Sequence, residues 1–459
     1  MFLDSIRQSG ARWMRLAAAC AALCAGPAHA FIDGISAPGS TFALTADADY
    51  ISVADGVSFY AWGYRVTGSA APLMQFPGPT IVVNQGDTVT LTLTNNLPVN
   101  TSIIFPGQLD VSAVDPNAPD GIAVTDAGNV GKLAREAAPL GGTVSYRFVA
   151  SRPGTFMYRS GTQMEVQQEM GLFGALIVRP AATNQAYEHP STYFDRETLF
   201  VLSELDPLWR QAVYDQVMAA NGAVLPNASI DTSAFGNYNP VYWFINGRNG
   251  PDTLAAAFLG TLPNQPYNCL PRMHANEHLL MRMVNAGREL HPFHHHGNNS
   301  WTIARDGNVL SSGDPVAVGP DIAQSNFTLQ MVPGQTVDAI YWWSGYDLGW
   351  DVYGNAPCGK AGQPACPAAQ PGQLQADVGK PVPVKLPSEL ELTYGELYSG
   401  SPYLGSFGAR PVGAGAQNLT AAYFHMFHSH NEREIINGGV YPGGMMTFVV
   451  IEPPSVPIQ

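Results

Sequence analysis

The chain has 459 residues with a formal net charge of −14, only 13% of them are charged, and glycine (47) and proline (37) are abundant. This composition favours turn-rich β-structure over long helices, and the length allows two or three domains. A surface this acidic repels nucleic acid and anionic lipid, so we expect no nucleic-acid partner and favour cations as ligands.

The first thirty residues have the pattern of an export signal. Arginines at positions 7, 12 and 15 flank the start of an apolar run over 16–25, and Ala28-His29-Ala30 forms a small-residue cleavage site. The run is too short to cross a membrane, and no later segment is long enough. We expect a signal peptide at 1–30, cleaved near Ala30, and a periplasmic or secreted protein that is not membrane-embedded.

Alternating apolar residues predict the first strands. Residues 80–94 read PTIVVNQGDTVTLTL, in which valine and leucine alternate with threonine after a Gly-Asp turn. Residues 144–148 repeat this alternation, which is typical of a half-buried strand. Residues 171–178 (GLFGALIV) form a nearly continuous apolar run, as expected of a central strand.

The same order of strands then recurs. LTLTNNLPVNTSIIFPG (91–107) is matched by LMRMVNAGRELHPFHHHG (280–297), and FMYRSG (156–161) by FHMFHSH (424–430). A fixed order of matching strands indicates two copies of one β-sandwich. We expect a first domain at 31–183, a linker at 184–194, and a second domain at 195–459 with a loop insertion at about 344–420.

Three cysteines follow the export signal. Cys358 and Cys366 bracket a Gly/Pro-rich loop, CGKAGQPAC, and in an oxidising compartment we expect them to form a disulfide. Cys269 is then left over. Its neighbours carry no charge that would activate the thiol, so we expect it to be buried and inert.

Seven of the eleven histidines fall in two short segments, HPFHHHG (291–297) and FHMFHSH (424–430). Side chains two apart on a strand share a face, so His294 pairs with His296, and His428 pairs with His430. Two adjacent strands of this kind would form a pocket of four imidazoles, which suits copper, zinc, iron or nickel. Copper heads the affinity order among these metals.

The remaining histidines are weaker candidates. His295 and His425 point to the opposite face, so we expect them to be outward or to lie behind the ligands. His274 and His278 lie apart from both segments. The alternative to a metal site is a set of ordinary surface or core histidines. Against it, four imidazoles gathered without a metal would repel one another once protonated.

The histidine segments resemble those of multicopper oxidases. HPFHHHGNN is similar to the family's HPxHxHG segment, and FHSHNEREIINGGVYPGGMM is similar to its HCHxxxH…GM segment. GPTIVVNQGDTVTLTLTNNLPVNTSI and GTFMYRSGTQMEVQQEMGLFGALIVRP resemble the strands that lead to its other two histidine motifs. The resemblance implies an all-β fold of two cupredoxin-like Greek-key β-sandwich domains.

The sequence departs from the family at the copper ligands. The first-domain HWHG motif falls on Ile104-Phe105-Pro106-Gly107, and the other first-domain HxH falls on Arg159-Ser160-Gly161. Eight histidines hold three coppers in the family, whereas only His294, His296, His428 and His430 remain here. The resemblance also assigns the blue copper ligands to His291, Ser429 and Glu434, and a serine hydroxyl is a poor substitute for a thiolate.

These departures predict a copper-binding oxidoreductase with one mononuclear histidine site and about one copper per chain, rather than a complete blue plus trinuclear set. His294, His296, His428 and His430 are the expected ligands. His291 is a candidate fifth ligand or proton shuttle. Glu432, placed by alternation on the face of His428 and His430, is a candidate oxygen ligand or proton carrier. Glu434 is a weaker candidate, expected at the surface or behind the ligands.

The expected partner is a small-molecule or metal-ion electron donor. Arg159 could steer an anion toward the metal, and the resemblance raises a homotrimer in which another subunit forms the facing wall. Two alternatives stay open. One is a non-catalytic periplasmic copper-binding or structural cupredoxin protein, since fold does not fix function. The other is a protein that holds no metal at all.

Overall fold

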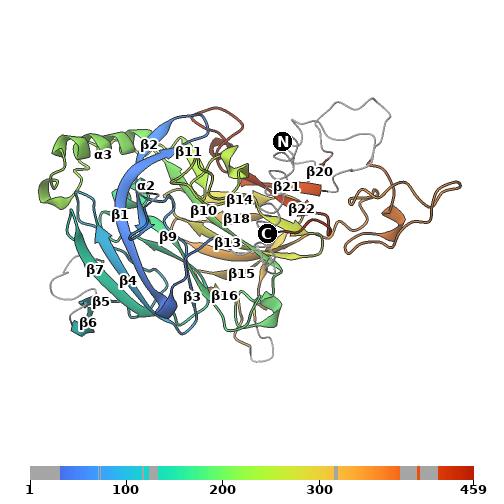
Figure 1. The fold of residues 1–459 in the computed structure, drawn as a ribbon, viewed down its shortest axis with the longest axis horizontal. Helices are drawn as coiled ribbons and strands as arrows, with labels where there is room; N and C mark the ends of the chain where they lie inside the picture. The colour runs from blue at the N-terminus through green and yellow to red at the C-terminus, as the bar shows by residue number, and fades with distance from the viewer. Residues whose placement is uncertain are drawn as a thin grey trace, which may run out of the picture.

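The computed structural model describes residues 32–70, 72, 74–115, 118–123, 133–314, 319–382, 401–403 and 422–458. The expected signal peptide and its cleavage site lie outside the described residues, as does much of the expected insertion. The described chain is dominated by strands that form two β-sandwiches side by side (Figure 1). The expectation of an all-β protein with two sandwiches is confirmed.

The first sandwich consists of a six-stranded sheet in the order β2-β1-β4-β7-β5-β6 and a three-stranded sheet in the order β3-β9-β8. Its strands are β1 (Thr41–Ser52), β2 (Ser58–Val66), β3 (Ile81–Asn84), β4 (Thr88–Asn95), β5 (Ser112–Asp115), β6 (Ala118–Ala123), β7 (Gly142–Val149), β8 (Gly154–Arg159) and β9 (Phe173–Arg179). A short helix, α2 (Met164–Met170), connects β8 to β9.

Apolar alternation explains why these segments form strands. In β4, Val89, Leu91 and Leu93 are all buried in the core, while the threonines between them are exposed or half-buried. In β7, Tyr146 and Phe148 pack into the same core. Period-two burial is what a sheet with one covered face requires. The strands expected at 88–94, 144–148 and 171–178 are confirmed.

The second sandwich pairs a sheet in the order β11-β10-β13-β19-β15-β16, with β17 beside β15, and a sheet in the order β12-β22-β21-β14-β18, with β20 beside β21. Its strands are β10 (Arg196–Leu205), β11 (Tyr242–Ile245), β12 (Arg272–His274), β13 (His278–Asn285), β14 (His291–His295), β15 (Ser300–Arg305), β16 (Asn308–Val309), β17 (Gln324–Asn326), β18 (Thr328–Met331), β19 (Thr336–Trp342), β20 (Ser401–Tyr403), β21 (Ala422–Ser429) and β22 (Met446–Glu452).

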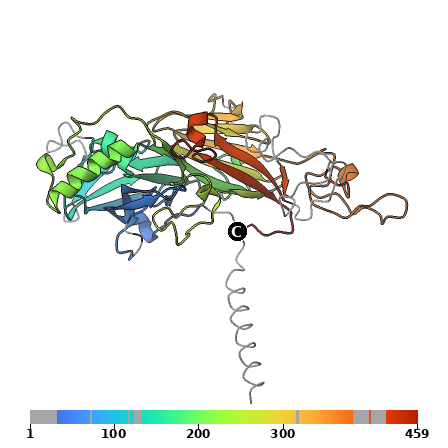
Figure 2. The same cartoon turned by 90° about the horizontal axis from the view of Figure 1, so that it is seen from above.

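The helix α3 (Pro207–Ala220) joins the two sandwiches. It follows β10 of the second sandwich, yet Figure 2 shows it lying against the first sandwich, and its Val213 is buried in the first core. Asp206 caps the helix by accepting from the backbone N–H of Leu208 at 2.8 Å, as N-cap residues do. Residues that follow β10 of the second sandwich therefore pack against the first sandwich.

The cysteines are arranged as expected. Cys358 and Cys366 form a disulfide in the loop that projects beyond the second sandwich, drawn in orange in Figure 1. Cys269 is a buried free cysteine, and burial raises the pKa of its thiol to about 12. A thiol with so high a pKa stays protonated and unreactive.

Within the part of the chain that the structure describes, no helix combines the length and apolar character that a membrane crossing requires.

Candidate metal centre

The two histidine segments are neighbouring strands of one sheet. Strands β14 and β21 pair antiparallel, with His294 opposite His428 and Phe293 opposite Ser429. Residues directly opposite in an antiparallel pair project to the same face. The register therefore places both H-x-H pairs on one side of the sheet.

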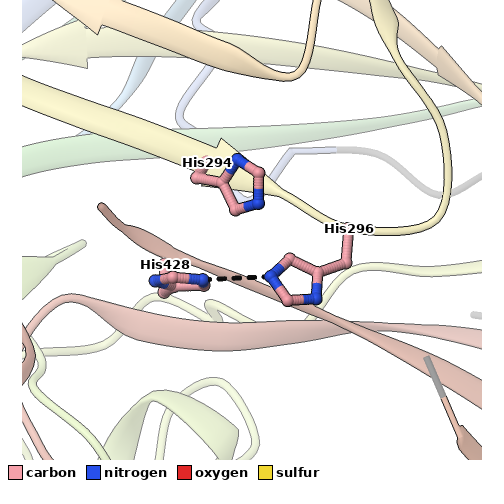
Figure 3. Close-up of side chains that lie close together, drawn as sticks. All are labelled: His294, His296 and His428. Carbon is pink, nitrogen blue, oxygen red and sulfur yellow. Dashed lines mark hydrogen bonds between the residues drawn. The ribbon is translucent and has the colours of Figure 1, made fainter. Parts of the chain in front are cut away.

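Three of these imidazoles meet closely (Figure 3). One nitrogen from each of His294, His296 and His428 lies within 4.8 Å of the other two. The Nε2 atoms of His296 and His428 are 3.1 Å apart. His296 follows the end of β14, and its backbone N–H donates to the carbonyl of Met426 at 3.0 Å, which continues the strand pairing. Among the described residues, this is the group of histidine, cysteine or acidic side chains with metal-binding geometry.

His430 completes the cluster on its solvent side. The ring centroids of His294 and His430 are 4.9 Å apart, and His430 stacks on His428 at 5.8 Å. His430 is exposed, whereas His296 is buried and the other two rings are half-buried. The structure thus brings together all four of the expected ligands, with one side open to solvent.

Hydrogen bonds fix the orientation of two rings. Nδ1 of His428 lies 2.7 Å from the carbonyl oxygen of Ser429, which can only accept, so Nδ1 carries the proton. The Nε2 atom of His428 then holds the lone pair, and it faces His296. Nδ1 of His294 lies 2.9 Å from Oγ1 of Thr328, which leaves Nε2 of His294 available to a metal. Such partners behind the ligands are typical of histidine metal sites.

Two rings of the cluster, those of His294 and His428, stay uncharged near neutral pH. Burial and, to a smaller extent, the neighbouring imidazoles together lower the pKa of His428 to about 3. Burial and the rings of His296 and His430 lower the pKa of His294 to about 4. Metals bind neutral imidazole, so these two rings are ready to act as ligands.

His291 does not join this cluster. Its ring is fully buried, with Nδ1 2.9 Å from Oε2 of Glu434 and Nε2 3.0 Å from Oε2 of Glu204. Burial lowers the pKa of His291, but the bonds to the two carboxylates outweigh burial and raise it to about 10. An imidazolium that donates from both nitrogens has no lone pair for a metal. The structure therefore does not support His291 as a fifth ligand.

Glu432 and Glu434 differ in burial, and it is Glu434 that lies in the interior. Strand β21 ends at Ser429, and Glu432 begins the 3-10 helix η7 (Glu432–Ile435), so strand alternation no longer applies to it. Glu432 is exposed, whereas Glu434, expected at the surface or behind the ligands, is fully buried against His291. The signal we missed is Asn431-Glu-Arg-Glu434, which has the spacing of a capping box. The Asn431 amide donates to Oε1 of Glu434 at 3.0 Å.

His295 and His425 face the core and not the outside. The ring of His295 packs against Tyr341 and Phe427, and His425 packs against Trp343. Burial lowers the pKa of His295 to about 3. Of the two strand faces, the cluster occupies the one that points away from the sandwich core. The alternation was predicted correctly, and of the two positions expected for His295 and His425 the outward one is wrong.

In the first sandwich, the positions that match the family's histidine ligands make other contacts. Arg159 donates to Oε1 of Gln168 at 2.7 Å, within the first sandwich. A Cβ atom at Gly161 would lie 2.6 Å from Cγ2 of Ile104 and 3.1 Å from Oγ of Ser102. A side chain there is excluded by its neighbours.

Comparisons with known proteins agree with this architecture. Residues 74–183 match the family model of multicopper oxidases. Laccase-24 of Oryza sativa subsp. japonica is 28% identical over 271 residues, which cover 58% of this chain and 38% of that protein. An L-ascorbate oxidase of Cucurbita pepo var. melopepo is 36% identical over 143 residues, which cover 31% of this chain and 22% of that protein.

A solved blue copper oxidase from Nitrosomonas europaea has a TM-score of 0.51 at 18% identity, covering 89% of this chain and 85% of that chain. This likeness shows the cupredoxin-like fold of the two sandwiches. The chain spans less than two fifths of the length of the laccase and less than a quarter of the ascorbate oxidase. These matches show a multicopper oxidase domain at residues 74–183 and a likeness of the chain to laccases and to an ascorbate oxidase.

Proposed function

We propose that His294, His296, His428 and His430 bind one copper ion, and that the protein is an exported, copper-dependent oxidoreductase with a mononuclear site. The convergence of three imidazole nitrogens within 4.8 Å carries this proposal. All-imidazole sites suit copper, which binds most tightly among the divalent metals of the first row.

The chain's own residues prepare this site for a metal. The Ser429 carbonyl holds the tautomer of His428, and Thr328 orients His294. The low pKa values of His294 and His428 keep protons from competing with a metal at neutral pH. Bound copper would supply one-electron redox chemistry at the solvent-facing side of the cluster.

Two features oppose a complete set of oxidase coppers. At the blue copper position that the resemblance assigns to His291, Ser429 and Glu434, the structure has a buried hydrogen-bonded ion pair and a hydroxyl. At the first-sandwich positions, Ile104 and Gly161 offer no ligand atom, and a Cβ added at Gly161 would lie only 2.6 Å from Cγ2 of Ile104. Both features favour one copper over four.

The solvent-exposed side of the histidine cluster is where an electron donor could reach a bound metal. His430 is exposed, and the exposed ring of Phe327 lies 5.7 Å from that of His294. We propose that a small molecule or a metal ion donates electrons there, and that a second and third copy of the chain cover part of this face in a homotrimer. The Cys358–Cys366 disulfide supports the proposal of export to an oxidising compartment.

Metal content tests the copper site directly. Purified wild-type protein should hold about one copper per chain after dialysis. The double variant His294→Ala, His428→Ala should hold almost none, while His278→Ala, which changes a partly exposed histidine paired with Asp195, should match the wild type. Equal copper in the double variant and the wild type would refute the site.

A non-catalytic copper-binding protein is the second candidate. The first-sandwich positions favour it, because Ile104 and Gly161 offer no atom that could bind a metal. Oxygen uptake by the copper-loaded protein with phenols, Cu(I), Fe(II) or Mn(II) separates the candidates. The oxidoreductase predicts turnover with at least one donor that is lost in the double variant, and the binder predicts none.

A further inference from the structure

A line of hydrogen-bonded side chains crosses the junction between the two sandwiches. The Tyr238 hydroxyl lies 2.7 Å from Oε2 of Glu169, on α2, and 3.1 Å from Oε1 of Glu204, on β10. Oε2 of Glu204 then lies 3.0 Å from Nε2 of His291, and Nδ1 of His291 lies 2.9 Å from Glu434. The four ionisable groups other than Tyr238 are buried, and Tyr238 is half-buried.

The donors and acceptors in this line require an additional proton. The single hydroxyl proton of Tyr238 can serve only one of the two carboxylates. Oε1 of Glu204 also accepts from the backbone N–H groups of Arg288 and Glu289, so Glu204 acts as a carboxylate. The short contact between Glu169 and Tyr238 is then satisfied when Glu169 carries a proton and donates it to the Tyr238 oxygen.

Charge balance leads to the same assignment. Three carboxylates, Glu169, Glu204 and Glu434, face two buried cations, His291 and Arg210, whose Nε lies 3.6 Å from Glu169. One proton on the three carboxylates makes these five groups neutral together, as a low-dielectric interior favours. Burial also raises the pKa of Glu169 to about 7, although Arg210 and Tyr238 oppose the shift.

Of the other charged groups around the line, Arg288, Glu289 and Arg433 lie nearer to solvent, whereas the carboxylate of Asp206 is buried and accepts from backbone N–H groups of Leu208 and Asn239. The guanidinium of Arg288 stacks over the Tyr238 ring at 4.2 Å. The charges of Glu204, Arg433 and Glu434 act on Glu289, whose pKa is raised chiefly by burial. The backbone N–H of Asp206 donates to Oε1 of Glu169 at 3.0 Å.

We propose that Glu169, Tyr238, Glu204, His291 and Glu434 form a buried proton relay that is loaded at Glu169 and ends at Glu434. In one transfer the Glu169 O–H bond breaks and its proton binds the Tyr238 oxygen, while the Tyr238 proton passes to Oε1 of Glu204. The Nδ1–H bond of His291 breaks and that proton passes to Glu434. Glu169 ends as a carboxylate, Glu204 and Glu434 end as neutral acids, and His291 keeps its Nε2 proton and ends neutral. Tyr238 is neutral before and after, so the total charge of the five groups is unchanged.

The relay ends close in sequence to the proposed metal ligands. Glu434 accepts from the side chain of Asn431, the residue after His430. Moving a proton to Glu434 removes a negative charge near this turn, which would offset a change of charge at the cluster. This role rests on the proposed copper site, whereas the relay itself is a property of the metal-free protein.

Nitrogen NMR of metal-free protein labelled at histidine tests the relay. In the wild type, the His291 ring nitrogens should shift with a midpoint near pH 7, the pH at which Glu169 loses its proton. Tyr238→Phe, which removes only the connecting hydroxyl, should abolish that response, and so should Glu169→Gln. Tyr193→Phe and Glu165→Gln, at exposed positions, should leave it unchanged.

Two results would overturn the relay. One is a His291 signal that does not change between pH 6 and 8 in the wild type. The other is a response that persists in Tyr238→Phe or Glu169→Gln protein whose circular dichroism is native. Because no metal is present, either result leaves the copper proposal standing, and a failed copper count leaves the relay standing.

Discussion

Equivalent strand ends of the two sandwiches have opposite contents. In the second sandwich, β14 and β21 aim four imidazoles at one place, whereas in the first the matching positions hold Ile104, Pro106, Arg159 and Gly161. Both ends belong to well-packed sandwiches with buried cores. A sandwich of this kind thus packs a buried core without metal ligands at these strand ends.

A second contrast lies within the second sandwich. On the outer face of β14 and β21, His294 and His428 are neutral imidazoles, while His291, on β14, is held as a cation between two carboxylates. Neutral imidazole binds metals and a doubly bonded imidazolium does not. His291 is thus protonated and His294 neutral, although they are three residues apart, and we assign them different functions.

The largest expected effect comes from removing that cation. His291→Leu would leave Glu204 and Glu434 buried without their shared partner, which costs about 3–5 kcal/mol when one member of a buried ion pair is lost. Urea unfolding should show this loss, while His278→Ala should change the free energy of unfolding by no more than about 1 kcal/mol. A loss of similar size in both variants would contradict the assigned charge.

The pH dependence of stability sharpens the same contrast. Because the folded state raises the pKa of His291 from 6.5 to about 10, its contribution is complete below pH 6.5 and is lost as pH rises toward 10. The urea midpoint of the wild type should therefore fall between pH 7 and 10. His291→Gln should be less stable at pH 7 and have a flatter profile, and an equally steep profile would count against the charged pair.

Attempting to restore the first sandwich should fail. In Gly161→His the new Cβ would meet Ile104 at 2.6 Å, and overpacking of this kind destabilises by about 1–3 kcal/mol. We expect a lower thermal midpoint and no additional copper. A second copper bound with unchanged stability would show that the two strand ends are less different than we infer.

The smallest expected effect comes from a change in the group that orients the His294 ring. Thr328→Val removes the hydroxyl 2.9 Å from Nδ1 of His294 and should weaken copper binding by about 10-fold or more, as for other groups that orient metal-binding histidines. Competition with a copper chelator measures the change. Thr90→Val, at a half-buried position of β4, is the matched control and should leave affinity unaltered.

The sequence predicted the parts of this molecule that depend on strand periodicity. Duplicated alternation located both sandwiches, and spacing by two placed His428 and His430 on one face. The same rule misplaced Glu432, because the strand ends at Ser429 and a capped turn begins. It also could not tell which face meets the core, so His295 and His425 were expected either outside or behind the ligands.

The charge and the partners of His291 could not be predicted from a local sequence pattern. Its partners, Glu204 and Glu434, lie 87 and 143 residues away in the chain, and only the folded sheets bring them to its two nitrogens. Likewise, Glu169 meets Glu204 through Tyr238 only because α2 and β10 meet at the junction.

Anomalous X-ray diffraction at the copper edge, on crystals of the copper-loaded protein, is the most direct test of the proposed single copper site. We predict one strong peak per chain, bounded by His294, His296 and His428. A peak beside His291 and Ser429, or one in the first sandwich near Ile104 and Gly161, would contradict it.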